Sequence, residues 1–183
     1  MAAACLLFNH SGVRGVGVDA IMASAGVARN TFYRYFPSKD LLVVAYFERV
    51  ETEWRTWLGD VVGGAEVTPH ARLVRVFEVL AAWFDSPTFR GSPMVNVANE
   101  VGDRQPRVAE LAREHSTFVH AFLAGLAIEA GVAAPDDLAY ELQILLNGAV
   151  TTAQLESDPG RRRAVALHAG HAAAAAVAAR AVS

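Results

Sequence analysis

VDAIMASAGVARNTFYRYFPSKDLL, residues 18–42, is the stretch that decides the fold of this chain. Apolar residues recur at helical spacing over its first eight positions and predict a short helix. Gly26 follows as a helix stop, because glycine adopts a left-handed backbone without steric cost. Residues 28–36 predict a second helix, which Pro37 ends, and Ser38 has the hydroxyl that an N-cap needs to start a third. Two short helices joined by a glycine-containing turn are typical of the helix-turn-helix, whose second helix lies in the major groove of DNA.

The second helix of this pattern has a dense polar surface. Phe32 and Phe36, four residues apart, take its inner face. The side chains on its outer face are Arg29, Asn30, Thr31, Tyr33, Arg34 and Tyr35, with Lys39 just beyond. Arginine pairs with a guanine edge and asparagine with an adenine edge, whereas threonine, tyrosine and lysine suit phosphate oxygens. The alternative is a solvated surface with tyrosines packed at a helix end, and the glycine turn and the serine cap favour DNA binding over it.

This run resembles the DNA-binding signature of TetR-family transcriptional regulators. The matching residues are Ile21, Ala25, Gly26, Val27, Thr31, Phe32, Tyr33, Tyr35, Phe36, Ser38, Lys39, Asp40, Leu41 and Leu42. The resemblance implies phosphate contacts from Thr31, Tyr33, Tyr35 and Lys39, and base contacts from Ala28, Arg29 and Asn30. It covers only the first quarter of the chain, and the rest of the family is too variable for transfer residue by residue.

The predicted DNA-binding domain, residues 1–44 and called the head below, departs from the family pattern at three places. Gly17 stands where the family usually has threonine or serine, so a helix cap and an expected phosphate contact are lost, although glycine is tolerated as an N-cap. Asn30 stands where the family often has glycine or proline, so we expect base readout there to be particular to this protein. The first predicted helix, residues 1–10, is shorter than usual and lacks the family's basic arm, which leaves open a misassigned start site or a truncated chain.

The composition limits what the whole chain can be. Its 183 residues carry a net charge of −3, yet residues 1–50 hold five basic and three acidic side chains, and residues 51–183 hold the other eleven and sixteen. A mildly basic head on an acidic body fits contact with DNA at one end only. Charges or helix breakers interrupt every apolar stretch, so we expect no membrane contact. The single cysteine, Cys5, excludes an internal disulfide and fits a cytoplasmic location.

The remaining sequence predicts helices and no strands, because no segment alternates with period two over a useful length. Pairs of a capping residue and a proline, beginning at Thr68, Ser92 and Asp158, mark helix starts. The further predicted helices span residues 39–58, 69–84, 93–101, 107–130, 135–157 and 161–182. We therefore expect an all-α fold of about nine helices, with a helix-turn-helix DNA-binding domain at residues 1–44 and an effector-binding and dimerisation domain at residues 45–183.

The last two predicted helices carry an apolar surface suited to pairing with a second copy. Over residues 137–155 the apolar face is wider than one core contact needs, and residues 167–182 are mostly small alanines, which allow close helix approach. The resemblance implies a four-helix bundle made by these two helices from each subunit. Burial inside one subunit is the alternative. We expect a homodimer, because a head this small reads DNA best in duplicate.

Aromatic and amide side chains in the body suggest a cavity for a small organic effector, and the family resemblance implies one. The candidates are Trp57, Phe77, Trp83, Phe84, Met94, Asn96, Asn99, Phe118, Phe122 and Asn147. An apolar cavity with a few polar anchors suits an apolar or aromatic molecule. Each aromatic residue taken alone fits a packed core better, whereas the three asparagines are stronger candidates because buried amides need partners.

No constellation in the sequence points to catalysis. His168 and His171 lie three residues apart, but no carboxylate or cysteine completes a metal site. A glycine-rich phosphate loop and a nucleophile elbow are also missing from the sequence. We therefore expect no enzyme, no catalytic residue, no metal and no cofactor.

The sequence thus predicts a dimeric regulator that binds a double-stranded DNA operator and responds to a small molecule. Effector binding is expected to tilt the helix over residues 39–58, change the separation of the two recognition helices and release a repressor from its operator. The alternative is a helical small-molecule-binding protein whose head is degenerate, which the missing arm and Gly17 keep open.

Overall fold

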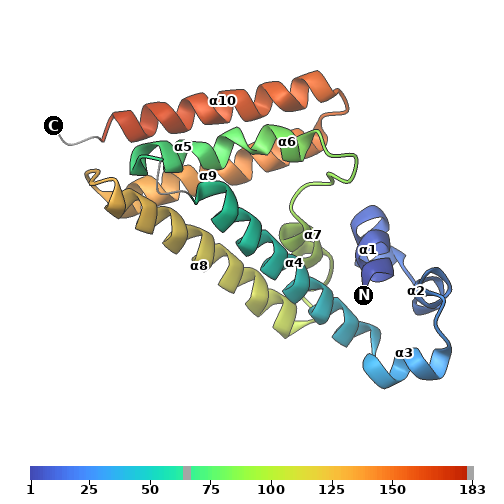
Figure 1. Ribbon diagram of the computed structural model, residues 1–183. Coiled ribbons are helices and arrows are strands. Elements are labelled where there is room, and N and C mark those ends of the chain that lie inside the picture. The colour runs from blue at the N-terminus through green and yellow to red at the C-terminus, as the bar shows by residue number, and fades with distance from the viewer. Residues whose placement is uncertain (64–66, 181–183) are drawn as a thin grey trace. The chain divides into compact units, whose positions relative to one another are not determined.

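The computed structural model describes residues 1–63 and 67–180, which form helices joined by short loops (Figure 1). The helices are α1 (Ala2–Gly15), α2 (Val18–Ala25), α3 (Arg29–Tyr35), α4 (Lys39–Val62), α5 (Pro69–Glu78), α6 (Leu80–Phe84), α7 (Pro93–Val101), α8 (Pro106–Glu129), α9 (Pro135–Leu155) and α10 (Pro159–Ala178). The all-α class is confirmed, since the described residues contain no strand. Counting α5 and α6 as one helix, because only Val79 separates them, gives the nine that we expected.

The described chain divides into two compact units. The first comprises residues 1–54 and 92–115, and the second comprises the described part of residues 55–91 and 116–183. Both α4 and α8 run through a dividing point, so each helix contributes to both units. The predicted boundary after residue 44 falls within α4 and within the first unit, so these units do not coincide with the predicted domains. The functional division at residue 44 stays a prediction.

Capping side chains start three of the later helices, as the sequence predicted. Thr68 Oγ1 accepts a hydrogen bond from the backbone N–H three residues later at 3.3 Å, and Ser92 Oγ accepts the equivalent bond at 3.4 Å. A carboxylate oxygen of Asp158 accepts the third bond at 2.8 Å. Each cap is followed by a proline, whose missing N–H costs nothing in the first turn.

Some helix limits differ from those predicted. The first helix, predicted over residues 1–10, kinks at Gly12, where φ is 70° and ψ is 161°, and continues to Gly15. At its end, α4 passes beyond residue 58, because its ladder continues until Gly63 N–H donates to the Gly59 carbonyl at 2.8 Å. The helix predicted over residues 69–84 is divided at Val79, whose N–H makes a long bond of 3.4 Å. The predicted end of the last helix, at residue 182, lies outside the described residues.

Aromatic side chains fill the core of the first unit. Phe8 on α1 meets Tyr46 on α4 edge-on, with ring centroids 5.3 Å apart, and Phe32 on α3 belongs to the same buried cluster. Burial raises the pKa of Tyr46 to about 12 and also raises the pKa of the half-buried Cys5 thiol. Both groups therefore stay protonated at neutral pH, and Cys5 lacks the thiolate character of a reactive cysteine.

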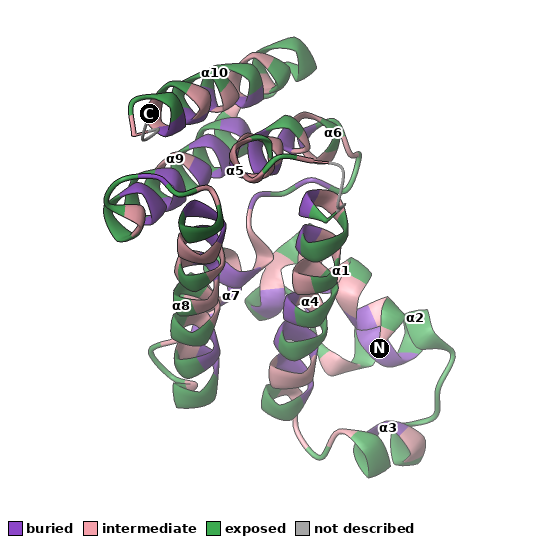
Figure 2. Cartoon of the chain, turned by 60° about the vertical axis from the view of Figure 1, so that its left-hand side comes forward, coloured by how far each residue is buried: buried purple, intermediate pink, exposed green. Residues whose placement is uncertain are grey.

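In the second unit α10 packs against α9, α5 and α6. The largest fully buried side chains there include Phe77, Phe84, Leu138 and Leu142. Small residues line the buried side of α10, where Ala166, Ala169, Ala173 and Val177 are all buried. Figure 2 shows that α9 and α10 carry buried residues along one side and exposed residues along the other. Part of the apolar face predicted for dimerisation therefore belongs to the core of a single chain.

Candidate DNA-binding interface

A left-handed glycine makes the turn between α2 and α3. Gly26 has φ 63° and ψ 32°, and its N–H donates to the Ala23 carbonyl at 3.3 Å. The next N–H, from Val27, donates to the Met22 carbonyl at 3.1 Å. Together these two bonds form a Schellman motif, which satisfies the last carbonyls of α2 and turns the chain sharply. The turn that the sequence predicted at Gly26 is confirmed.

The two faces of α3 differ as its spacing predicted. Phe32 is 5% exposed, and its ring meets that of Tyr33 edge-on at a centroid distance of 5.3 Å. Among the predicted DNA contacts, those that are exposed are Ala28, Arg29, Asn30, Tyr33, Arg34 and Tyr35, and those that are half-buried are Thr31 and Lys39. Figure 2 shows that most of the α3 surface is exposed. Packing of Phe32 thus orients the polar face of this short helix outward.

Two arginines on this face lie against neighbouring tyrosine rings. Arg29 Cζ is 5.5 Å from the Tyr33 ring centroid, and Arg34 Cζ is 5.1 Å from that of Tyr35. Such cation–π contacts contribute about 0.5–1 kcal/mol each at exposed sites. They restrain side chains that would otherwise lose more rotamer freedom when they bind DNA.

Asp19 is a member of this surface that the sequence reasoning missed. Its carboxylate lies 4.0 Å from the Arg29 guanidinium, and both side chains are largely exposed. An exposed pair of this kind is weak and screened by salt, so Arg29 remains available to a stronger acceptor. The signal was present in the sequence, because an acidic residue in the first turn of α2 suits the helix dipole but opposes a phosphate nearby.

The start of α4 places Lys39 beside α3. Ser38 Oγ accepts the Leu41 N–H at 3.2 Å, which confirms the predicted cap. Within the same unit, the Gln105 side-chain amide donates to Asp40 Oδ1 at 2.8 Å. These bonds fix the first turn of α4 on both of its sides, so that Lys39 extends from a backbone that is held in place.

Gly17 caps α2 with its backbone alone. It has extended φ −82° and ψ 155°, and no side-chain cap is made there. A Cβ built at this position meets no atom within 4 Å. Neither the backbone nor the surroundings therefore require glycine, and a threonine or serine fits the same place.

A hydrogen bond joins α1 to α7 within the first unit. The Arg14 backbone N–H donates to Glu100 Oε2 at 2.9 Å, and the Arg14 guanidinium lies 3.6 Å from Asp103. The kink at Gly12 makes room for this carboxylate, because a Cβ there would come within 2.7 Å of Glu100 Oε1. The sequence reasoning missed Glu100.

The first unit also holds a buried acid and base pair that the sequence reasoning missed. Glu51 on α4 and His115 on α8 are joined at 2.6 Å, with side chains 10% and 15% exposed. The Trp54 indole meets the His115 ring edge-on at a centroid distance of 4.9 Å. Polar residues inside an otherwise apolar helix face were the available signal. Because removing one partner strands a buried polar group, this pair fixes how α4 and α8 pack within the unit.

Large apolar side chains on α9 and α10 remain exposed. Ile144 is 69% exposed, Leu155 83% and Leu167 54%. A shallow hollow of about 620 Å³ lies between the two helices, lined by Ile144, Gly148 and Ala172 among others. Ile144 lines this hollow, whereas Leu155 and Leu167 lie outside its lining. The predicted dimer surface is therefore divided, with leucines such as Leu138 in the core and these three side chains outside it.

The ten effector candidates are distributed over both units. Met94, Asn96 and Asn99 belong to the first, and the other seven belong to the second. Burial is complete or nearly so for Phe77, Phe84 and Met94, as a packed core requires. Half-buried candidates are Trp57, Trp83, Asn96, Phe118 and Phe122.

The expectation that the three candidate asparagines are buried is wrong for two of them. Asn99 and Asn147 are exposed, so neither is a buried amide in need of a partner. Within the second unit the rings of Phe118 and Phe122 stack at a centroid distance of 6.1 Å, and Arg55 Cζ lies 4.0 Å from the Phe118 centroid. Contact between any of the ten residues and an effector stays a prediction.

Two protein-family models together match most of the chain. Residues 1–46 match the family model described as "Bacterial regulatory proteins, tetR family". Residues 69–169 match a second one, described as "Tetracyclin repressor-like, C-terminal domain". An uncharacterised HTH-type transcriptional regulator of Mycobacterium tuberculosis strain H37Rv is 34% identical over 115 residues, which are 58% of this chain and 54% of that protein. The chain thus spans about half the length of the curated relatives that it matches.

Solved structures resemble the whole fold. A TetR-family transcriptional regulator from Streptomyces coelicolor superposes with a TM-score of 0.87 at 26% identity, covering 96% of this chain and 92% of its own. A TetR transcriptional regulator from Chloroflexus aurantiacus superposes with a TM-score of 0.80 at 26% identity, covering 98% and 92%. In the part of the chain that the structure describes, no helix combines the length and apolar character needed to cross a membrane.

Proposed function

Because this chain belongs to the TetR family of bacterial regulatory proteins, we propose that it is a homodimeric transcriptional regulator that reads an operator with α3. The observation that carries the proposal is the exposed surface of α3, where arginine, asparagine and tyrosine side chains stand on a helix anchored by buried Phe32. A DNA-binding role requires the compartment that holds the DNA, so we propose a cytoplasmic location.

Each side chain of the α3 surface has a chemical role in this proposal. Arg29 and Asn30, in the first turn, face base edges, to which each can make two hydrogen bonds. Phosphate oxygens accept hydrogen bonds from the hydroxyls of Thr31, Tyr33 and Tyr35 and from the ammonium group of Lys39 and the guanidinium of Arg34. Ala28 approaches the groove without blocking it, and its methyl group suits contact with a thymine methyl.

The exposed apolar side chains of α9 and α10 support a homodimer. Ile144 lies beside small residues such as Gly148 and Ala172, and Leu167 is exposed on α10, so two copies can approach closely and bury these side chains together. A pair of heads then contacts two half-sites about 34–36 Å apart, one turn of DNA. Two-point attachment compensates for the small charge excess of a single head.

Release from DNA is assigned to a small organic effector that prefers one arrangement of the dimer. Half-buried aromatic residues of the second unit, such as Trp57, Phe118 and Phe122, are the candidates that can contact an apolar or aromatic molecule without first unpacking a core. Because α4 contributes to both units, a shift at one end of this helix reaches the other. In this arrangement the protein acts as a repressor.

A helical small-molecule-binding protein with a degenerate head is the second candidate. It is favoured by Gly17, which gives no side-chain cap, and by Asp19, whose carboxylate stands beside Arg29. Under this alternative the purified protein binds a small molecule and shows no preference for any DNA sequence.

DNA footprinting separates the two functions. Purified protein is tested on the DNA that flanks its own coding region, across a series of salt concentrations. A regulator protects a roughly palindromic site with two half-sites about one helical turn apart, and its affinity falls as salt rises. Absence of any protected site over this DNA and over a random-sequence selection would contradict the proposal.

A further inference from the structure

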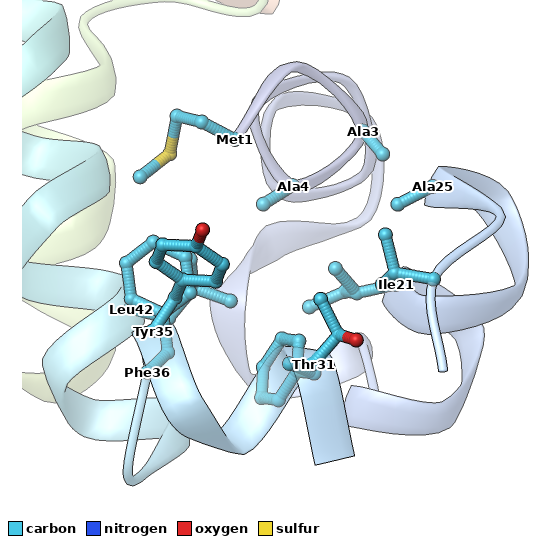
Figure 3. Close-up of a pocket in the computed structure, with 11 residues that line it drawn as sticks. Met1, Ala3, Ala4, Ile21, Ala25, Thr31, Tyr35, Phe36 and Leu42 are labelled. Carbon is cyan, nitrogen blue, oxygen red and sulfur yellow. The ribbon is translucent and has the colours of Figure 1, made fainter. Parts of the chain in front are cut away.

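We propose that the head contains a second ligand site, a hollow beneath α3 that binds a small neutral molecule of mainly apolar character and thereby opposes DNA binding. The hollow has a volume of about 300 Å³ and lies entirely within the first unit. Figure 3 shows Met1, Tyr35 and Leu42 on one of its sides and Ala3, Ile21 and Ala25 on the other. The part of the proposal that concerns DNA rests on the function proposed above.

The lining of the hollow selects the class of ligand. Alanine, isoleucine, leucine and phenylalanine side chains make most of its wall, and none of its side chains carries a charge. A charged ligand would lose hydration there without gaining a charged side-chain partner, so the lining favours neutral ligands. Apolar cavities bounded by aliphatic and aromatic groups bind neutral aromatic molecules. The volume lies at the lower end of the range for ligand pockets, which fits one or two fused rings.

Two hydroxyl groups give the hollow a polar edge. Thr31 and Tyr35 both line it, and they stand four residues apart on the same side of α3. Figure 3 shows Tyr35 beside Leu42, with its hydroxyl toward Met1, and Thr31 below Ile21. A ligand that carries one hydroxyl group can hydrogen-bond there while its rings contact Ile21 and Leu42. A phenol with fused rings therefore combines every feature of the site.

The same two hydroxyls connect this site to DNA. Thr31 and Tyr35 are the side chains that we assign to phosphate oxygens, so a bound phenol and a phosphate compete for them. Coupling between the two ligands is reciprocal. Bound DNA therefore lowers the affinity for phenol by the same factor by which bound phenol lowers the affinity for DNA. Met1, a flexible side chain on the wall, can move to admit the rings without unpacking the core.

This hollow is separate from the effector cavity proposed in the body. None of the ten effector candidates lines it. Its position differs as well, because it is bounded by α1, α2, α3 and the start of α4 rather than by any residue of the second unit. A molecule bound here acts on the DNA-contacting helix directly and needs no change in the dimer.

Titration of the full chain with 2-naphthol tests the proposal, with binding followed by naphthol fluorescence and by the spectra of isotope-labelled protein. Ala3→Leu extends a side chain into the hollow from α1, and Ala25→Leu does the same from α2 on the same side. The matched control is Ala2→Leu, one residue away on the same helix, exposed and outside the lining. Circular dichroism verifies that each variant is folded.

We expect 2-naphthol to bind the native chain and the Ala2→Leu variant, and to bind both filling variants at least about tenfold more weakly. Saturating naphthol should weaken operator binding of the native chain about tenfold and leave that of Ala3→Leu unchanged. No binding to the native chain, or equal binding to all variants, would overturn the site. Self-association that Ala3→Leu abolishes would assign the hollow to a protein side chain and would also overturn it.

Operator binding by the unliganded protein is measured first in the same series. If it fails, the proposed regulatory function is wrong, whereas the naphthol titration still decides whether the site exists. If the unliganded protein binds the operator, and naphthol binds in the hollow without weakening operator binding, the proposed competition between phenol and phosphate is wrong.

Discussion

The exposed side chains of α3 are polar or cationic, whereas those of α9 and α10 include large apolar groups. On α3 the exposed groups are polar or cationic and the one buried side chain is Phe32, whereas on α9 and α10 large apolar groups such as Ile144 and Leu155 are exposed. The first surface, on α3, is rich in polar and cationic side chains, and the second, on α9 and α10, has exposed apolar side chains. The contrast indicates two kinds of partner, an anionic polymer for the first surface and an apolar protein face for the second.

The largest effect is expected at the residue that orients α3. Phe32→Ala should destabilise the head by about 3–5 kcal/mol, because it removes a buried aromatic ring and leaves a cavity. Chemical denaturation and operator affinity are the measurements. Tyr35→Ala, which truncates a side chain that is 66% exposed, is the matched control and should change stability by less than about 0.5 kcal/mol while still weakening DNA binding. Equal loss of stability in both variants would contradict the two-faced account of α3.

The next largest effect is expected from the apolar surface. Ile144→Glu combined with Leu167→Glu should convert the dimer to a monomer, because two charges would be buried in an apolar contact. Sedimentation measures the change in mass, and operator affinity should fall by about a hundredfold when two-point attachment is lost. Ile128→Glu is the control, since Ile128 on α8 is 66% exposed and lies outside this surface. A dimer that survives the double substitution would place its interface elsewhere.

Gly17→Thr is expected to raise the stability of the head and its affinity for DNA. A cap and a lower entropy of the unfolded chain should together stabilise it by about 0.5–1 kcal/mol. The new hydroxyl should also tighten DNA binding, by an amount that the salt series can separate from non-specific effects. Thermal unfolding is compared with that of Gly12→Ala, which should be destabilised, because the backbone there is left-handed and a Cβ would contact Glu100. Loss of stability in Gly17→Thr would show that the position requires glycine.

The smallest effect is expected at Asp19. Asp19→Asn should tighten operator binding about twofold to threefold at low salt and by less at high salt, because it removes a carboxylate that competes with phosphate for Arg29. Fluorescence anisotropy at several salt concentrations measures this difference. An effect that does not change with salt would exclude an electrostatic cause.

Local signals in the sequence predicted the head well. The left-handed Gly26, the buried Phe32 and the Ser38 cap each depend on residues within one or two turns of the chain, so their chemistry is readable without the fold. The caps at Thr68, Ser92 and Asp158 were predictable for the same reason.

Contacts between distant segments were not predictable. Glu100 meets Arg14 across 86 residues of chain, and His115 meets Glu51 across 64, and neither pair has a local pattern. Exposure of Asn99 and Asn147 depends on how whole helices pack, so an amide on an apolar helix could not be placed inside or outside in advance. Similarly, only the folded chain separates the buried leucines of α9 from exposed Ile144.

In the proposed function, α3 reads bases with its first turn and holds phosphates with the residues beyond. The most direct measurement is operator affinity of Asn30→Ala and Lys39→Ala against the native operator and a set of single-base variants. We predict that Asn30→Ala loses about 1–3 kcal/mol at one base pair and relaxes the preference there, while Lys39→Ala weakens all sites equally and lowers the salt slope by about one. Uniform weakening by Asn30→Ala, or no effect of either substitution, would contradict the account.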